Sequence, residues 1–198
     1  LTQNVATRGS VRDMVEMGAE WSPGQGRTRR QGRRSFSVSG RVAEPGVKLA
    51  PAGITVRELI EEFCGGMAEG HVFKGYLPGG ASGGILPASK GDIPLDFDTL
   101  QVEDCFIGSA AIVVLSEADN ARDVALNLLR FFADESCGQC TPCRVGCEKA
   151  VMLMDRPEWD GDLLREISTT MMDASICGLG QAAPNPMLMV LKHFPEDI

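Results

Sequence analysis

The sequence lacks the features that place a chain in or across a membrane. No window approaches eighteen consecutive apolar residues, and the first residues, LTQNVATRGSVRDMV, lack the basic-then-apolar layout of a secretory signal. We therefore expect a cytoplasmic protein without a membrane span, or one that is peripheral to a membrane through partner subunits. A starting methionine is also missing, so we expect a processed chain or a piece of a longer one.

Residues that build hydrolytic or nucleotide-binding sites are scarce as well. The chain has only two histidines, and neither lies near plausible carboxylate or nucleophile partners for a hydrolytic triad. The glycine-rich run at 79–84 fits neither the G-x-G-x-x-G fingerprint nor a P-loop. The sequence therefore indicates neither a hydrolytic triad nor a phosphate-binding loop.

Excess positive charge is missing too, since the formal net charge is −8. A chain of this charge is not expected to bind nucleic acid. One basic island, RTRRQGRR at 27–34, breaks the trend, but no aromatic residues interleave with it to stack on bases. We interpret this island as a solvated linker or a subunit-docking loop.

The pattern of apolar residues predicts an α+β chain with two bodies. Phe36 and Val38 alternate with serines, as in a half-buried strand, and further strands are predicted at 72–76 and 110–115. Between them, Thr55 and Glu58 form a capping box that opens a short helix. The order strand, turn, strand, helix, strand predicts a small β-grasp domain over residues 33–115, preceded by a linker or the remnant of another domain at 1–32.

After residue 115 the apolar period becomes 3.6, which predicts a helical domain over 116–198. Ser116 with Asp119 is expected to open the first helix, and a second helix is predicted over 144–154. A third follows Asp160, and a fourth begins at Asn185-Pro186, with asparagine as the N-cap. The sequence thus predicts a four-helix bundle.

Seven cysteines in a chain without a secretion signal indicate metal binding or catalysis rather than disulfides. Four of them crowd into ESCGQCTPCRVGCEKA with the spacing C-x2-C-x2-C-x3-C, which begins a bacterial ferredoxin run. In that run the fourth cysteine serves a second cluster, and here Cys147 lies within the predicted second helix. Cys177, in the glycine-flanked loop SICGLG, is the better fourth ligand. The proposed cubane ligands are Cys137, Cys140, Cys143 and Cys177.

Two alternatives remain open at this stage. Four thiolates would also satisfy a structural zinc site, and the chain would then be a non-catalytic interaction module. Zinc modules usually pair their ligands in two separate knuckles, whereas three ligands are contiguous here. The cysteines could also be reduced structural thiols, and we expect that state for Cys64, Cys105 and Cys147.

These motifs resemble a known family. ESCGQCTPCRVG followed by SICGLGQAAPNP closely resembles the iron–sulfur end of the flavoprotein subunit that accepts electrons from NADH in respiratory complex I. The same subunit type occurs in NAD-reducing hydrogenases and NAD-dependent formate dehydrogenases. FSVSGRVAEPGVKLAPAGITVRELIEEF is similar to its β-grasp (soluble-ligand-binding) domain, so the resemblance covers residues 33–198. Among the branches, the formate dehydrogenase β subunit looks most similar.

The resemblance implies an electron-transfer role. In that family NADH reduces FMN, and electrons pass to one [4Fe–4S] cluster and onward to other subunits, here a thioredoxin-like [2Fe–2S] subunit and a catalytic subunit. By matching positions, the four proposed cysteines would hold the cluster, Gly178 and Leu179 would face the flavin, and Arg144 would be a nearby charge that influences the cluster. The family's large FMN- and NADH-binding domain has no counterpart here, so the chain alone is expected not to oxidise NADH.

Overall fold

Alternating burial organises the first two strands of the sheet. In the computed structural model, which describes residues 2–3 and 5–198 apart from the side chains of residues 6 and 7, β1 spans Arg33–Gly40. Phe36 and Val38 are buried, and the intervening serines are exposed. A turn leads to β2 (Gly46–Pro51), which pairs antiparallel with β1 and places Phe36 opposite Lys48.

The sheet is completed by strands from further along the chain. β3 (Phe73–Leu77), β4 (Leu86–Pro87) and β5 (Ala111–Ser116) give a five-stranded sheet in the order β2-β1-β5-β3-β4. β5 pairs parallel with β1 and antiparallel with β3. The predicted capping box is present: Thr55 opens α2 (Val56–Glu58), which continues as a wider helical turn over Leu59–Phe63. The β-grasp arrangement is therefore confirmed, with the short β4 added to it.

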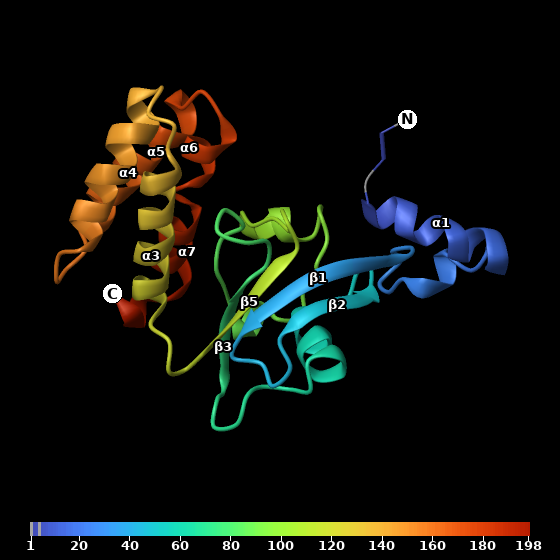
Figure 1. The fold of residues 1–198 in the computed structure, drawn as a ribbon. Helices are drawn as coiled ribbons and strands as arrows, with labels where there is room; N and C mark the ends of the chain where they lie inside the picture. Colours follow the sequence, from blue (N-terminus) through green and yellow to red (C-terminus); the bar gives the residue numbers. More distant parts are fainter. Residues whose placement is uncertain (1, 4) are drawn as a thin grey trace.

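The second body is helical and stands beside the sheet (Figure 1). Its helices are α3 (Ala121–Glu135), α4 (Thr141–Met154), α5 (Gly161–Ala174), the short α6 (Gly178–Ala182) and α7 (Asn185–His193). Most of the apolar residues predicted to face inward are buried, among them Leu129, Leu164 and Val190, whereas Leu163, predicted inward on the third helix, is 36% exposed. Within the described part of the chain, no helix combines the length and apolar character needed to cross a bilayer.

Three predicted helix starts were wrong. Ser116 and Asp119 do not open a helix: the Asp119 carboxylate accepts from the Ser116 N–H at 2.9 Å, the chain turns, and Asn120 caps α3. α4 begins at Thr141. Proline suits the first turn at position 142, because the N–H groups of a first turn have no acceptor within the helix and proline has no N–H to satisfy. Asn185 lies inside the first turn of α7 rather than at its cap.

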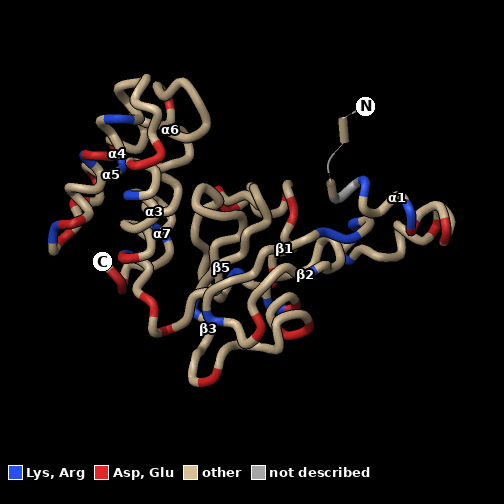
Figure 2. The backbone as a smooth tube through the Cα atoms, viewed as in Figure 1, with Lys and Arg blue, Asp and Glu red and all other residues tan. Residues whose placement is uncertain are grey.

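Four of the five arginines in the basic island pair with carboxylates of the sheet domain or of the first helix, α1 (Val5–Met17). Arg27 donates to both carboxylate oxygens of Glu62 at 2.7 Å, and Arg33 pairs with Asp13 of α1 at 3.0 Å. Figure 2 shows this basic segment where α1 approaches β1. The arginines thus fasten the segment to its own chain, which the sequence pattern did not indicate. The other pairs are Arg30 with Asp96 and Asp98, and Arg34 with Asp96.

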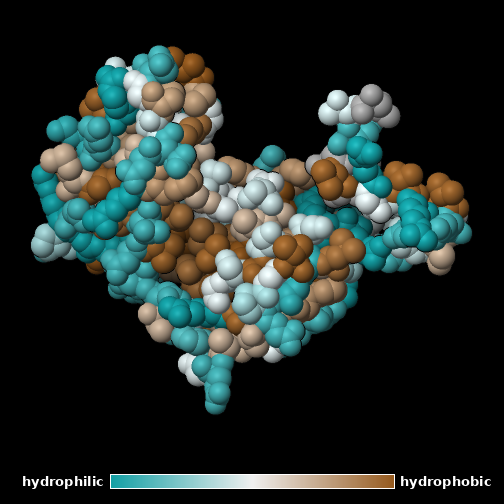
Figure 3. All heavy atoms as spheres, viewed as in Figure 1, coloured by the Kyte–Doolittle hydropathy of each residue, from teal (hydrophilic) through white to brown (hydrophobic). Residues whose placement is uncertain are grey.

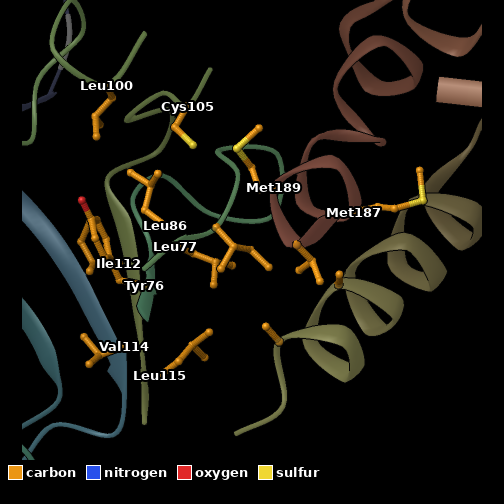
Figure 4. Close-up of a cluster of buried hydrophobic side chains, with 14 of the residues drawn as sticks. Tyr76, Leu77, Leu86, Leu100, Cys105, Ile112, Val114, Leu115, Met187 and Met189 are labelled. Carbon is orange, nitrogen blue, oxygen red and sulfur yellow. The ribbon is translucent and has the colours of Figure 1, made fainter. Parts of the chain in front are cut away.

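Buried contacts join the sheet to the helical body. Figure 4 shows Met189 of α7 beside Cys105 and Leu86, which belong to the core that the two bodies share. Phe194, just after α7, packs on Gly75 of β3: an added Cβ on Gly75 would lie 3.1 Å from the ring. Since Gly75 has no side chain, the aromatic ring can approach the strand backbone closely.

One carboxylate, that of Asp197, links three parts of the chain. It accepts from the Lys74 ammonium of β3 at 2.7 Å and from the backbone N–H of Ala121, the first residue of α3, at 2.6 Å. The side chains of Lys74 and Asp197 are only 12% and 10% exposed. Because both charges are shielded from water, losing one of them leaves the other without compensation.

We predict that Asp197→Asn lowers the free energy of unfolding by roughly 3 kcal/mol, because Lys74 would remain nearly buried without a counter-charge. The matched control is Asp155→Asn, which removes a carboxylate from a half-exposed pair with Arg130 and should cost less than about 1 kcal/mol. Urea denaturation followed by circular dichroism measures both. Equal losses in the two variants would show that Asp197 does not link the bodies.

A second prediction concerns pH. A hydrogen bond from Arg41 lowers the pKa of Asp119 from 3.8 to about 2. The ionised Asp119 carboxylate therefore stabilises the fold fully when the pH is above the pKa of the unfolded chain, and this stabilisation is lost as the pH falls through the pKa of the folded chain. The stability difference between the native chain and Asp119→Asn should therefore be about 1 to 2 kcal/mol and constant above pH 5, and it should shrink below pH 4. A difference that grew on acidification would contradict this assignment.

Candidate metal centre

Four cysteines lie at the starts of two helices at the same end of the helical body. Cys137 is in the loop after α3, Cys140 directly precedes α4, and Cys143 lies in its first turn. Cys177 directly precedes α6. Cys137 and Cys177 are exposed, Cys140 is half-buried, and Cys143 is buried. All are free thiols, so each can serve as a ligand.

The loop that carries Cys177 packs against the loop that carries the other three. Hydrogen bonds from the backbone N–H groups of Ile176 and Cys143 lower the pKa of the Cys140 thiol. Gly180 of α6 packs on Cys143, where an added Cβ would lie 2.7 Å from the cysteine Cβ. The two segments far apart in the sequence therefore meet at Cys140 and Cys143, and N–H donors at a helix start favour the thiolate form that binds metal.

Short polar contacts shape the first cysteine loop. Gly138 has a φ of +78°, a conformation that favours glycine, and its N–H donates to the Ser136 hydroxyl at 3.3 Å. The same hydroxyl lies 3.4 Å from the Cys143 sulfur. The Arg144 guanidinium donates to the Gly138 carbonyl. Arg144 thus holds the loop around the thiols, although its side chain is exposed.

Cys147 occupies a different environment. It is fully buried on α4, one turn beyond Cys143, and burial raises the pKa of its thiol to about 12. Cys64 and Cys105 are also buried, and burial raises the pKa of both thiols. These environments keep the three residues as neutral thiols, as the sequence predicted.

The donor set fits an iron–sulfur cluster. Among the residues that the structure describes, no three or more Cys, His, Asp or Glu side chains are gathered closely enough to hold one metal ion. Three of the four thiols come from the segment between α3 and the first turn of α4, and the fourth comes from the loop before α6. Soft sulfur donors of this kind suit a compact inorganic cluster that presents several iron atoms.

Gly178 and Leu179 lie on another side of the same end. They line a cavity of about 650 Å³ between the helical body and the sheet domain, together with Phe106, Phe132 and Met172. Figure 3 shows apolar residues gathered in the hollow between the two bodies. Asn185 closes one edge, because its amide donates to the Ser82 carbonyl at 3.0 Å.

Sequence reasoning missed several contributors to this site. α6 was predicted as loop, since five residues are too few for periodicity to reveal a helix. Gly180 is visible in the sequence as the second glycine of SICGLG. Only the fold shows why a glycine is required there: a Cβ at this position would lie too close to Cys143. Ser136 and Ser175 flank two of the cysteines in sequence, and only the structure brings their hydroxyls to the thiols.

Comparison with known proteins agrees with this geometry. Residues 123–198 match the family described as NADH-ubiquinone oxidoreductase-F iron-sulfur binding region, and residues 35–86 match the SLBB domain. The chain is 34% identical to the NADP-reducing hydrogenase subunit HndC of Solidesulfovibrio fructosivorans, covering 100% of this chain and 41% of that protein. It is also 34% identical to the mitochondrial 51 kDa subunit of NADH-ubiquinone oxidoreductase of Neurospora crassa, covering 98% and 41%.

A solved structure has the same fold. The crystal structure of an NAD+-reducing [NiFe]-hydrogenase in the H2-reduced state superposes with a TM-score of 0.82 at 28% identity, covering all of this chain and 34% of that one. The chain spans less than half the length of these relatives. The matched regions and the arrangement of the cysteines lead to one conclusion: the chain carries an SLBB domain and an NADH-ubiquinone oxidoreductase-F iron–sulfur binding region, and it corresponds to part of the NADH-accepting flavoprotein subunits.

Proposed function

We propose that the chain is the electron-transferring part of an NAD-linked flavoprotein subunit, in which Cys137, Cys140, Cys143 and Cys177 hold one [4Fe–4S] cluster. The observation that carries this proposal is the meeting of two loops, where Ile176 contacts Cys140 and Gly180 packs on Cys143. When bound, the cluster supplies a one-electron carrier. The chain's own residues orient the four sulfurs and shield the Cys143 side from water.

The cavity beside α6 is the side from which we propose that electrons reach the cluster. Gly178 and Leu179 follow Cys177 directly and line this apolar hollow, so we propose that a flavin held by another part of the same polypeptide or complex approaches here. Arg144 is a fixed positive charge near the loop and would favour the more negative, reduced state. We place FMN binding and NADH oxidation in the portion of the relatives that this chain does not span, so the chain alone would not oxidise NADH.

The proposed partners follow from the relatives' names and from the family resemblance. The relatives are subunits of a hydrogenase and of an NADH-ubiquinone oxidoreductase. We propose a thioredoxin-like [2Fe–2S] subunit and a catalytic subunit as neighbours, and a formate dehydrogenase β subunit as the branch. We also propose a β-grasp domain at 33–115, a helical domain at 116–198, and a linker at 1–32 that the arginine pairs hold against the sheet domain.

The ligand assignment predicts opposite effects for two cysteines. Cys177→Ser should abolish most of the bound iron and acid-labile sulfide, because the cluster would lose its only ligand from the second loop. Cys147→Ala is the matched control and should retain about four iron atoms per chain, since a buried neutral thiol is not a ligand. Metal and sulfide analysis of anaerobically purified, reconstituted protein measures both.

Three outcomes would overturn this assignment. Retention of iron in Cys177→Ser would exclude Cys177 as a ligand, and loss of iron in Cys147→Ala would replace it with Cys147. One zinc per chain without sulfide in the native protein would support the alternative of a structural zinc site in an interaction module.

A further inference from the structure

The Ser136 hydroxyl is oriented toward a proposed cluster ligand. Its oxygen accepts a hydrogen bond from the Gly138 N–H at 3.3 Å and lies 3.4 Å from the Cys143 sulfur. A thiolate that ligates metal has no proton to give, so the hydroxyl must be the donor in this pair. The Gly138 N–H occupies one lone pair of the oxygen, which leaves the hydroxyl hydrogen free to point at the sulfur.

The Ser175 hydroxyl reaches the same centre from the second loop. The residue is only 6% exposed, and among the described residues its oxygen has no partner with ordinary hydrogen-bonding geometry. Its oxygen nevertheless lies near the Cys140 sulfur, on the side of the second loop that faces the cysteine loop. A Cβ added to Gly180 would contact both the Ser175 oxygen and Cys143, so these two groups lie within one side chain's width of each other.

Ser168 shows how a buried serine is normally accommodated in this body. It is 1% exposed, and its hydroxyl donates to the Leu164 carbonyl of the preceding helical turn at 2.7 Å. Ser175 has no such carbonyl partner among the described residues, although a buried polar group without a hydrogen bond costs about 1–3 kcal/mol. The difference indicates that the Ser175 hydroxyl serves an acceptor at the metal centre.

We propose that Ser136 and Ser175 are positioning residues that donate hydrogen bonds to the thiolate sulfurs of Cys143 and Cys140, and that they thereby raise the reduction potential of the cluster. The inference rests on the proposed function, since it requires the cluster to be bound. A hydroxyl that donates to a ligand sulfur stabilises the reduced state more than the oxidised state, because reduction adds negative charge to the centre. One serine acts from each loop.

The test is an EPR-monitored redox titration of the full chain carrying its cluster. Ser136→Ala and Ser175→Ala should each lower the midpoint potential, with a change in the reduction equilibrium of up to about tenfold, which is about 59 mV for a one-electron couple. Ser136→Thr keeps the hydroxyl and should restore the native potential. Ser168→Ala is the matched control and should leave the potential unchanged, because its hydroxyl bonds only to helix backbone.

The outcomes separate this inference from the function on which it rests. A native midpoint in both alanine variants, with iron content and spectrum intact, would overturn the hydrogen-bonding role alone. Absence of a reducible cluster in the native chain would overturn the proposed function and the inference with it. If Ser175→Ala loses iron, the midpoint of Ser136→Ala decides the question, since Ser136 is only half-buried.

Discussion

The structure depends on the contact between the loop that precedes α6 and the first turn of α4. Here the Ile176 N–H meets the Cys140 sulfur, and Gly180 allows α6 to approach Cys143 closely. The contact brings the loop of the distant Cys177 against the cysteine loop, so the packing of the chain itself contributes to ordering the proposed ligands.

The packing behind this contact explains how it is maintained. α4 and α5 approach closely at Gly146, where an added Cβ would lie 2.5 Å from the Met171 side chain, so the two helices hold both cysteine loops at one end of the body. At the opposite end, Asp197 joins α3 to the sheet through Lys74. The apolar hollow between the bodies therefore lies between these two sets of contacts, which hold the helices to one another and to the sheet.

Much of this architecture follows from local sequence signals. The capping box of Thr55 and Glu58, the Asp160 cap and the apolar stripes of the long helices depend on residues only a few positions apart. The prediction of Cys177 rather than Cys147 as the fourth ligand likewise rests on local signals, namely the ferredoxin-type spacing, the expected helix around Cys147 and the glycines beside Cys177. The predicted start of the first long helix at Ser116 was wrong for a physical reason. The Asp119 carboxylate accepts hydrogen bonds from the Ser116 N–H and from Arg41 instead of acting at a helix start. The roles of Ser136 and Ser175 could not be predicted, because a hydroxyl gives no periodic signal and its acceptor is determined by tertiary packing.

The central claim is that these four thiols enclose one redox-active cluster. The most direct measurement is the EPR spectrum of the anaerobically purified chain before and after reduction with dithionite. The account predicts a signal that appears only on reduction and integrates to about one spin per chain, as expected for a single one-electron centre. A chain that is silent in both states and contains zinc instead of iron would contradict it.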